Sequence, residues 1–132
     1  MCEPSNSPPP APLNRKSLLV ADGCFLIHKL IFRLFEGTFD SILPAATATE
    51  AEMFLRNYNV SHIVISARIA EGMSTTDLVD RWRAQYPTIQ RVVLYTGAEI
   101  SSTELGSSID AVVTKPCHCQ SLINAVTGEF PD

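Results

Sequence analysis

Several apolar runs of this sequence end at residues whose side chains could take part in chemistry. Asp22 follows one such run, Thr96 and Lys115 follow two others, and Ala67 comes just after a fourth, residues 63–65. A carboxylate, a hydroxyl and an ammonium group gathered at one edge of a sheet can bind ions, since open α/β sheets place their ligands at the carboxyl ends of the strands. The alanine interrupts this series, because a methyl group offers neither a nucleophile nor a ligand.

Apolar runs without polar alternation predict strands that are buried on both faces of a sheet. We expect such strands at residues 17–21, 39–43, 63–65, 91–95 and 111–114, the second of them closed by Pro44. Helical spacing of apolar residues predicts helices at about 24–36, 47–58, 75–86 and 120–126, with at most a turn or two at 101–105. Thr47 or Thr49 is expected to cap the second helix, and Thr75 or Thr76 the third.

The alternation of strands and helices predicts the fold class. Strands joined by short helical crossovers form a parallel sheet with helices on both faces, here a single-domain α/β protein with a doubly wound five-stranded sheet. We expect a disordered Pro-rich segment at residues 1–16, one domain at 17–128, and a tail or the start of a linker at 129–132. Residues 9–12 match a PxxP pattern, for which a solvated tail is the default interpretation.

The overall composition excludes several classes of partner. The net charge is −4 and like charges form no block, which argues against binding of nucleic acid or anionic membranes, because both require a basic face. No apolar run reaches the length of a membrane span, and the Pro-rich N-terminus does not resemble a signal peptide. We therefore expect a cytoplasmic protein whose four cysteines are free thiols.

Two short motifs resemble one family. Thr96-Gly97 and the segment from Asp110-Ala111 to Lys115-Pro116 resemble the receiver domains of response regulators, the CheY-like family, and the similarity runs from about 17 to 126. The loop 71–73 resembles the Pro-x-Met loop of that family. The resemblance implies a flavodoxin-like sheet with strand order 2-1-3-4-5 and a role in two-component or phosphorelay signalling.

The same resemblance assigns roles to single residues. In the family, paired acids after the first strand hold Mg²⁺, an Asp after the third strand accepts a phosphoryl group, and a Thr and a Lys engage the phosphate. Here Asp22 matches the second acid, Thr96 the hydroxyl and Lys115 the lysine, whereas the first acid falls on Ala21 and the acceptor on Ala67. The resemblance with these departures implies a degenerate pseudo-receiver that is not an enzyme, carries no cofactor and binds Mg²⁺ weakly or not at all.

The altered pocket leaves three questions open. Lys115 without a phosphate needs a counter-charge, so we expect an ion pair with Asp22 that fills the pocket, the alternative being a solvated, weakly coupled pair. Ser66 would replace the missing acceptor only if the strand slipped by one residue, because neighbouring side chains of a strand point to opposite faces. A third possibility is that the vacated crevice holds a small ligand, which would make the chain a flavodoxin-like binding protein.

The first helix carries aromatic side chains on its polar side. Its inward face is expected to comprise Leu26, Ile27, Leu30, Ile31 and Leu34, whereas Phe25 and Phe32 lie seven residues apart beside Lys29. This pattern indicates a partner-binding patch, unless the N-terminal segment or a loop covers it. As implied by the family, the partner would be a histidine kinase, a phosphotransfer protein or another receiver, or else a second copy of this chain.

Cysteine and histidine residues suggest a further, less specific site. Cys24 and the run Cys117-His118-Cys119 offer the ligands that Zn²⁺ prefers, although this spacing is not that of a common zinc motif. Buried free thiols are therefore the default, and no metal is expected. His28 and His62 show no partner in the sequence, so solvent-exposed or hydrogen-bonded roles are expected for both.

Overall fold

The computed structural model describes residues 16–66, 69, 74–96, 109–115 and 119–128, without the side chain of Cys119. Its elements in chain order are β2 (Ser17–Ala21), α1 (Phe25–Phe35), β3 (Ser41–Ala45), α2 (Ala48–Asn57), β4 (Val60–Ile65), α3 (Thr75–Gln85), β5 (Arg91–Thr96), β6 (Ala111–Thr114) and α4 (Cys119–Thr127). In the parts of the chain described, no helix is long and apolar enough to cross a bilayer.

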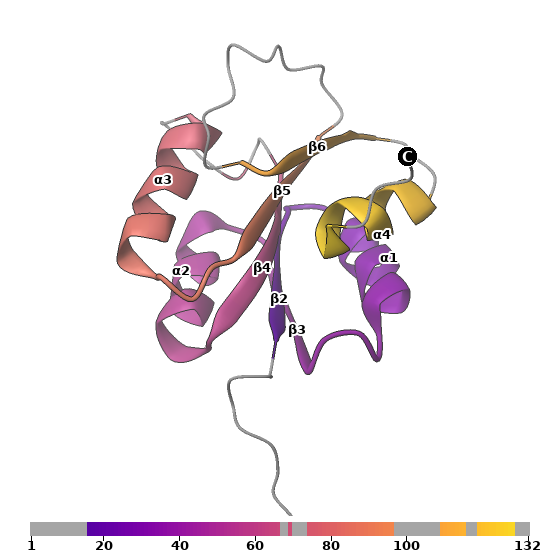
Figure 1. The fold of residues 1–132 in the computed structure, drawn as a ribbon, viewed down its shortest axis with the longest axis horizontal. Helices are drawn as coiled ribbons and strands as arrows, with labels where there is room; N and C mark the ends of the chain where they lie inside the picture. The colour runs from indigo at the N-terminus through magenta and orange to yellow at the C-terminus, as the bar shows by residue number, and fades with distance from the viewer. Residues whose placement is uncertain (1–15, 67–68, 70–73, 97–108, 116–118, 129–132) are drawn as a thin grey trace, which may run out of the picture.

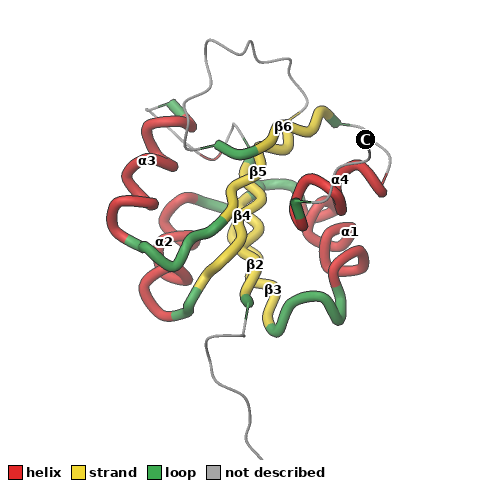
Figure 2. Tube along the Cα trace, viewed as in Figure 1, coloured by secondary structure: helices red, strands yellow, loops and turns green. Residues whose placement is uncertain are grey.

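The five strands form one parallel sheet in the order β3-β2-β4-β5-β6. Figure 1 shows helices α1 and α4 on one face of this sheet and helices α2 and α3 on the other, and Figure 2 shows the strands stacked between these two layers. Because β2 is flanked by β3 and β4, the order is 2-1-3-4-5 when strands are counted along the chain. The predicted doubly wound flavodoxin-like fold is therefore confirmed.

The central strand β4 is buried along its whole length and contributes to two separate cores. Ile63 and Ile65 pack with Trp82 between the sheet and helices α2 and α3. Val64 packs on the opposite face with Ile31 and Phe35 of α1. The uninterrupted apolar run thus reflects a strand covered on both sides, as the sequence pattern predicted.

Three local expectations were wrong. Pro44 does not close the second strand but lies within β3, which is tolerated because β3 is an edge strand and the missing N–H costs no ladder bond. Helix α3 is capped by the side chain of Ser74, which accepts a hydrogen bond from Asp77 N, and not by either threonine. Leu26 is exposed, and Phe35 takes the buried place at the other end of α1.

Helix α2 is capped by Thr47, as predicted, and is tied to α3 through one carboxylate. Glu52 Oε2 accepts hydrogen bonds from the buried Trp82 indole at 3.1 Å and from Arg81 at 2.7 Å. The indole hydrogen bond, with help from the guanidinium, holds the pKa of Glu52 below its usual range. The two helices on this face of the sheet are therefore joined by a polar contact as well as by their apolar core.

His62 is buried in β4, so the expectation that it is exposed to solvent was wrong and the hydrogen-bonded alternative applies. Its ring lies 5.0 Å from the ring of Phe39 in an edge-to-face contact, and its Nδ1 lies 2.7 Å from Ser61 Oγ at hydrogen-bond distance. Burial, followed by the positive charges of Lys16 and Arg91, lowers the pKa of His62 to about 4. The neutral imidazole is therefore the form that the fold accommodates.

This burial predicts a loss of stability in mild acid. The unfolded chain takes up a proton on His62 near pH 6.5 and the folded chain only near pH 4, so the contribution of His62 is complete above pH 6.5 and is lost as the pH falls toward 4. We expect the free energy of unfolding to fall by about 3 kcal/mol over that range on account of this residue. Denaturant unfolding of the wild type and of His62→Gln at several pH values measures it.

The His62→Gln variant should show a much flatter pH dependence between 4.5 and 7, because glutamine does not titrate. Equal slopes in the two proteins would contradict the assignment.

Candidate functional site

The carboxyl edge of the sheet brings Asp22 and Lys115 together. Lys115 Nζ donates to Asp22 Oδ2 at 2.8 Å and forms an ion pair with it. The side chain of Asp22 is 5% exposed and that of Lys115 24% exposed. The predicted ion pair is confirmed, and it is intermediate between the buried and the solvated alternatives because only the acid is fully enclosed.

Backbone contacts hold Asp22 in the turn between β2 and α1. Its Oδ1 accepts a hydrogen bond from Cys24 N at 2.8 Å, and its own N–H donates to the Ala45 carbonyl of β3 at 3.0 Å. The carbonyl of Asp22 accepts a hydrogen bond of 2.5 Å from His28 Nε2 on the first turns of α1. These contacts aim the carboxylate across the sheet toward β6.

Lys115 is held from the other side of the edge. Its backbone N–H donates to the Thr96 carbonyl at 2.7 Å, and its Nζ lies 5.1 Å from the centroid of the Tyr95 ring. A cation at this distance from an aromatic face is attracted to it. Thr96 is buried at the end of β5, so the three predicted polar residues do gather at one edge.

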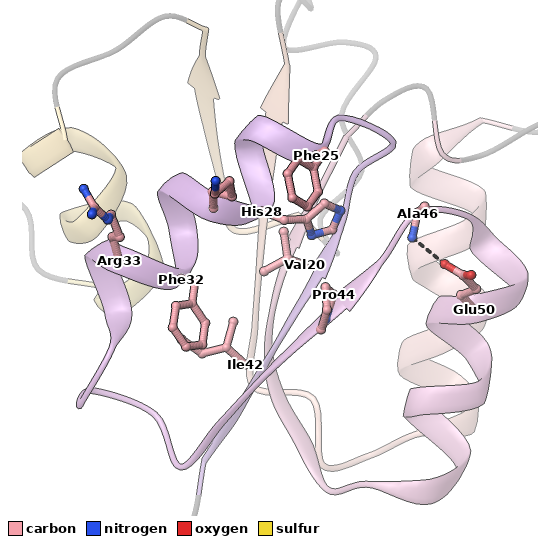
Figure 3. Close-up of a pocket in the computed structure, with 10 residues that line it drawn as sticks. Val20, Phe25, His28, Phe32, Arg33, Ile42, Pro44, Ala46 and Glu50 are labelled. Atoms are coloured by element: carbon pink, nitrogen blue, oxygen red, sulfur yellow. Dashed lines mark hydrogen bonds between the residues drawn. The ribbon is translucent and has the colours of Figure 1, made fainter.

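Helix α1 and the edge strand β3 enclose an apolar groove of about 500 Å³ on the face that also carries α4. Phe25 and Phe32 rise from α1 toward Ile42 and Pro44 of β3, as Figure 3 shows, with Val20 of β2 beneath them. Phe25 is 70% exposed and Phe32 52% exposed. The predicted aromatic pair on the polar side of this helix is therefore present, and it forms one wall of a groove.

Structural comparison finds the same fold in response-regulator receiver domains. A CheY-like receiver domain from Methanospirillum hungatei JF-1 matches with a TM-score of 0.70 and 21% identity, over 84% of this chain and 90% of that chain. A response regulator from Thermotoga maritima matches with a TM-score of 0.75 and 17% identity, over 87% and 97%. The chain has the receiver-domain fold.

A third match is informative about chemistry in the receiver fold. A response regulator from Burkholderia pseudomallei, solved with a phosphorylated aspartic acid, a calcium ion and citrate, matches with a TM-score of 0.69 and 19% identity, over 84% of this chain and 66% of that chain. No protein-family model and no curated protein matches the sequence itself. The likeness therefore lies in the three-dimensional arrangement and not in overall sequence.

The edge of this receiver fold can be compared with what a divalent cation requires. Mg²⁺ prefers octahedral oxygen coordination, commonly from one or two carboxylates, waters and substrate oxygens. Among the described side chains at this edge, Asp22 supplies the one carboxylate, and its two oxygens already accept bonds from Lys115 and Cys24. Ala21, at the position of the first acid, is buried in the core. This set of side chains does not fit a magnesium site.

The position of the phosphoryl acceptor, Ala67, lies outside the described residues. The neighbouring Ser66 is 5% exposed; its N–H donates to the Ala21 carbonyl at 2.9 Å and its carbonyl accepts from Ile69 N at 3.1 Å. A side chain with so little exposure to solvent is poorly placed to meet a phosphodonor.

The cysteine cluster cannot be assembled from the described residues. Cys24 is exposed, whereas Cys117, His118 and the side chain of Cys119 lie outside the described part of the chain. In the part that is described, no three His, Cys, Asp or Glu side chains come close enough to hold a metal ion. The zinc alternative therefore stays a sequence hypothesis.

Sequence reasoning missed the polar contacts that cross between distant segments. Asp110 Oδ2 accepts hydrogen bonds from Val92 N at 2.7 Å and from Arg83 at 2.5 Å, so an acid noted only as part of a family motif joins α3, β5 and β6. The bond from His28 to the Asp22 carbonyl was also unforeseen. Neither leaves a signal in the sequence, because the partners are related by strand order and turn geometry.

The ion pair makes a quantitative prediction. Asp22→Ala should lower the free energy of unfolding by about 2–3 kcal/mol, less than the 3–5 expected for a fully buried pair, because Lys115 retains access to water. Asp22→Asn should cost less, since an amide oxygen can still accept the Cys24 N–H. Denaturant unfolding of Asp22→Ala, Lys115→Met and the double variant gives the coupling energy. Strictly additive effects of the two single changes would show that the pair is solvated and uncoupled.

Proposed function

We propose that this chain is a degenerate receiver domain that acts in two-component or phosphorelay signalling as a protein-interaction module, without being phosphorylated. The observation that carries the proposal is the Asp22–Lys115 ion pair at the carboxyl edge of a receiver fold. In receivers that edge holds the metal and the phosphoryl group, and here its acid and its lysine neutralise each other.

The residues that would begin the chemistry support the same conclusion. Formation of an acyl phosphate requires a carboxylate nucleophile, and Ala67 has none. The Burkholderia pseudomallei protein of the same fold carries a phosphorylated aspartic acid together with a calcium ion. This chain has alanine at both Ala21 and Ala67, which the family resemblance places at one metal-binding acid and at the acceptor, so we expect weak or absent Mg²⁺ binding and no enzymatic activity.

The part of a receiver relay that faces partners is altered as well. Family resemblance places a switching aromatic at Val112 on β6, and Val112 is a partly exposed aliphatic residue here. What remains suited to recognition is the patch formed by Phe25, Lys29 and Phe32, where the Lys29 ammonium lies 5.4 Å from the centroid of the Phe25 ring. An exposed aromatic pair beside a cation is typical of protein-binding surfaces. We propose a cytoplasmic partner of the kinase, phosphotransfer or receiver class, or a second copy of this chain.

Incubation with acetyl phosphate tests the phosphorylation-independent role. We expect the intact mass of the protein to stay unchanged in the presence of Mg²⁺, because the nucleophile and one metal ligand are missing. The same Mg²⁺ concentration should leave the melting temperature unchanged, since a ligand that does not bind the native state cannot stabilise it. A phosphorylatable receiver treated in parallel shows that the reagent is active.

Stoichiometric addition of phosphate would refute this function. Peptide mapping of the added mass to Ser66 would instead support the unorthodox acceptor, and Ser66→Ala should then abolish the addition.

Replacement of Phe25 and Phe32 by serine tests the interaction surface. The double variant should lose binding to the cognate kinase or phosphotransfer protein by at least about tenfold, because each exposed ring supplies apolar contact area worth more than a kcal/mol when buried by a partner. Isothermal titration calorimetry measures the loss, and light scattering shows whether a dimer dissociates.

Met53→Ser is the matched control, since Met53 is equally exposed on α2, on the opposite face of the sheet. If the double variant binds as tightly as the Met53→Ser control, the α1 surface is not the contact.

A further inference from the structure

The groove between α1 and β3 is lined mainly by apolar side chains and is open to solvent. Phe25 and Phe32 form one wall, and Ile42 and Pro44 of the edge strand form the other. Both phenylalanines are more than half exposed, although a monomer gains stability by covering large apolar side chains. The groove therefore has the character of a docking surface.

Two basic side chains on the rim of the groove favour an occupant that presents hydrogen-bond acceptors. Lys29 and Arg33 on the α1 rim offer only donors. On the opposite rim, one carboxylate oxygen of Glu50 receives the Ala46 N–H at 2.7 Å, the dashed contact in Figure 3. Proline segments present carbonyl acceptors and no N–H, and their extended polyproline II form docks in grooves lined by aromatic side chains.

Such a segment belongs to this chain and leaves the domain beside the groove. Residues 8–12 read PPPAP, four residues before Lys16. Lys16 N donates to Asp40 Oδ2 at 3.2 Å and its carbonyl accepts from Asp40 N at 2.9 Å, so the chain departs next to the start of β3. That end of β3 carries Ile42, which lines the groove together with Phe32.

The lengths of the segment and the groove agree. The five residues of β3 extend about 16 Å at 3.3 Å each. Five residues in polyproline II form extend about 15 Å at 3.1 Å each. The three residues 13–15 reach at most about 10 Å, which is long enough for a reversal from β2 to the neighbouring groove.

We propose that the proline segment 8–12 lies in the groove between α1 and β3 of its own chain and covers Phe25 and Phe32. Because the segment is tethered, its effective concentration at the groove is of millimolar order. This inference concerns the same surface as the proposed function and rests on it for its role in signalling. A partner that binds this surface must displace the segment, so the N-terminus competes with partners for the groove.

Paramagnetic relaxation in the full-length chain tests the docking and needs no partner protein. A nitroxide is attached to Ser7→Cys, next to the proline segment, in a chain whose other cysteines are replaced by serine. We expect strong broadening of amide signals in α1 and β3 and little in α3, which lies on the opposite face of the sheet (Figure 1). Replacement of the four prolines at positions 8, 9, 10 and 12 by glycine should remove this contrast, because a flexible segment loses the preformed shape.

Phe32→Ser should lower the ratio of docked to free segment by about tenfold, through the loss of apolar contact. Met53→Ser should leave the ratio unchanged, and the amide spectrum of each variant reports that it is folded. Broadening that is equal on both faces, or that survives both the glycine and the Phe32→Ser changes, overturns the proposal. A further control mixes spin-labelled chain at natural isotope abundance with ¹⁵N-enriched chain that carries no nitroxide. Broadening in this mixture also overturns the proposal, because the contact is then between two copies. Since neither a phosphodonor nor a partner is present, failure here leaves the proposed function standing.

Discussion

A single charged contact joins the two ends of this fold at the edge where receivers perform their chemistry. The Asp22–Lys115 pair connects the first strand of the described domain to the last, 93 residues apart in the chain. An ammonium or a carboxylate group is costly to bury without a counter-charge, so Asp22 and Lys115 each lower the free-energy cost of burying the other. The other carboxylate oxygen of Asp22 accepts a hydrogen bond from Cys24 N, so both oxygens are engaged within the protein. The same contact therefore stabilises the sheet edge and neutralises its acid.

The edge of the sheet and the α1 groove are separate surfaces connected by one short turn. His28 lines the groove, and its Nε2 donates to the carbonyl of Asp22, whose side chain belongs to the ion pair. Glu50 on the far rim anchors Ala46 at the end of the neighbouring strand. An occupant of the groove therefore rests against the same β2–α1 turn that aims the carboxylate. The groove and the ion pair are therefore connected structurally through this turn.

The strands, their number and their parallel orientation could be predicted because each follows from a pattern along the chain, whereas the strand order was implied by the family resemblance. The apolar runs around Ile63 and Val93 have no polar alternation, which is what a strand covered on both faces requires. The predictions failed where a tertiary position outweighs propensity. Pro44 sits inside a strand because that strand is at the edge, and His62 is buried because Phe39 and Ser61 enclose its ring. Neither circumstance is visible in the residues next to them.

The candidate site divides in the same way. From the residue types alone it was determined that an alkyl group stands at Ala67, that an acid and a lysine must share one edge, and that two phenylalanines lie on the polar side of a helix. Only the tertiary structure decided how enclosed the ion pair is, that His28 supports it, and that Ile42 and Pro44 turn the exposed aromatics into a groove. The reason is that side-chain chemistry and periodicity are properties of the chain, whereas enclosure depends on which segments the strand order brings side by side.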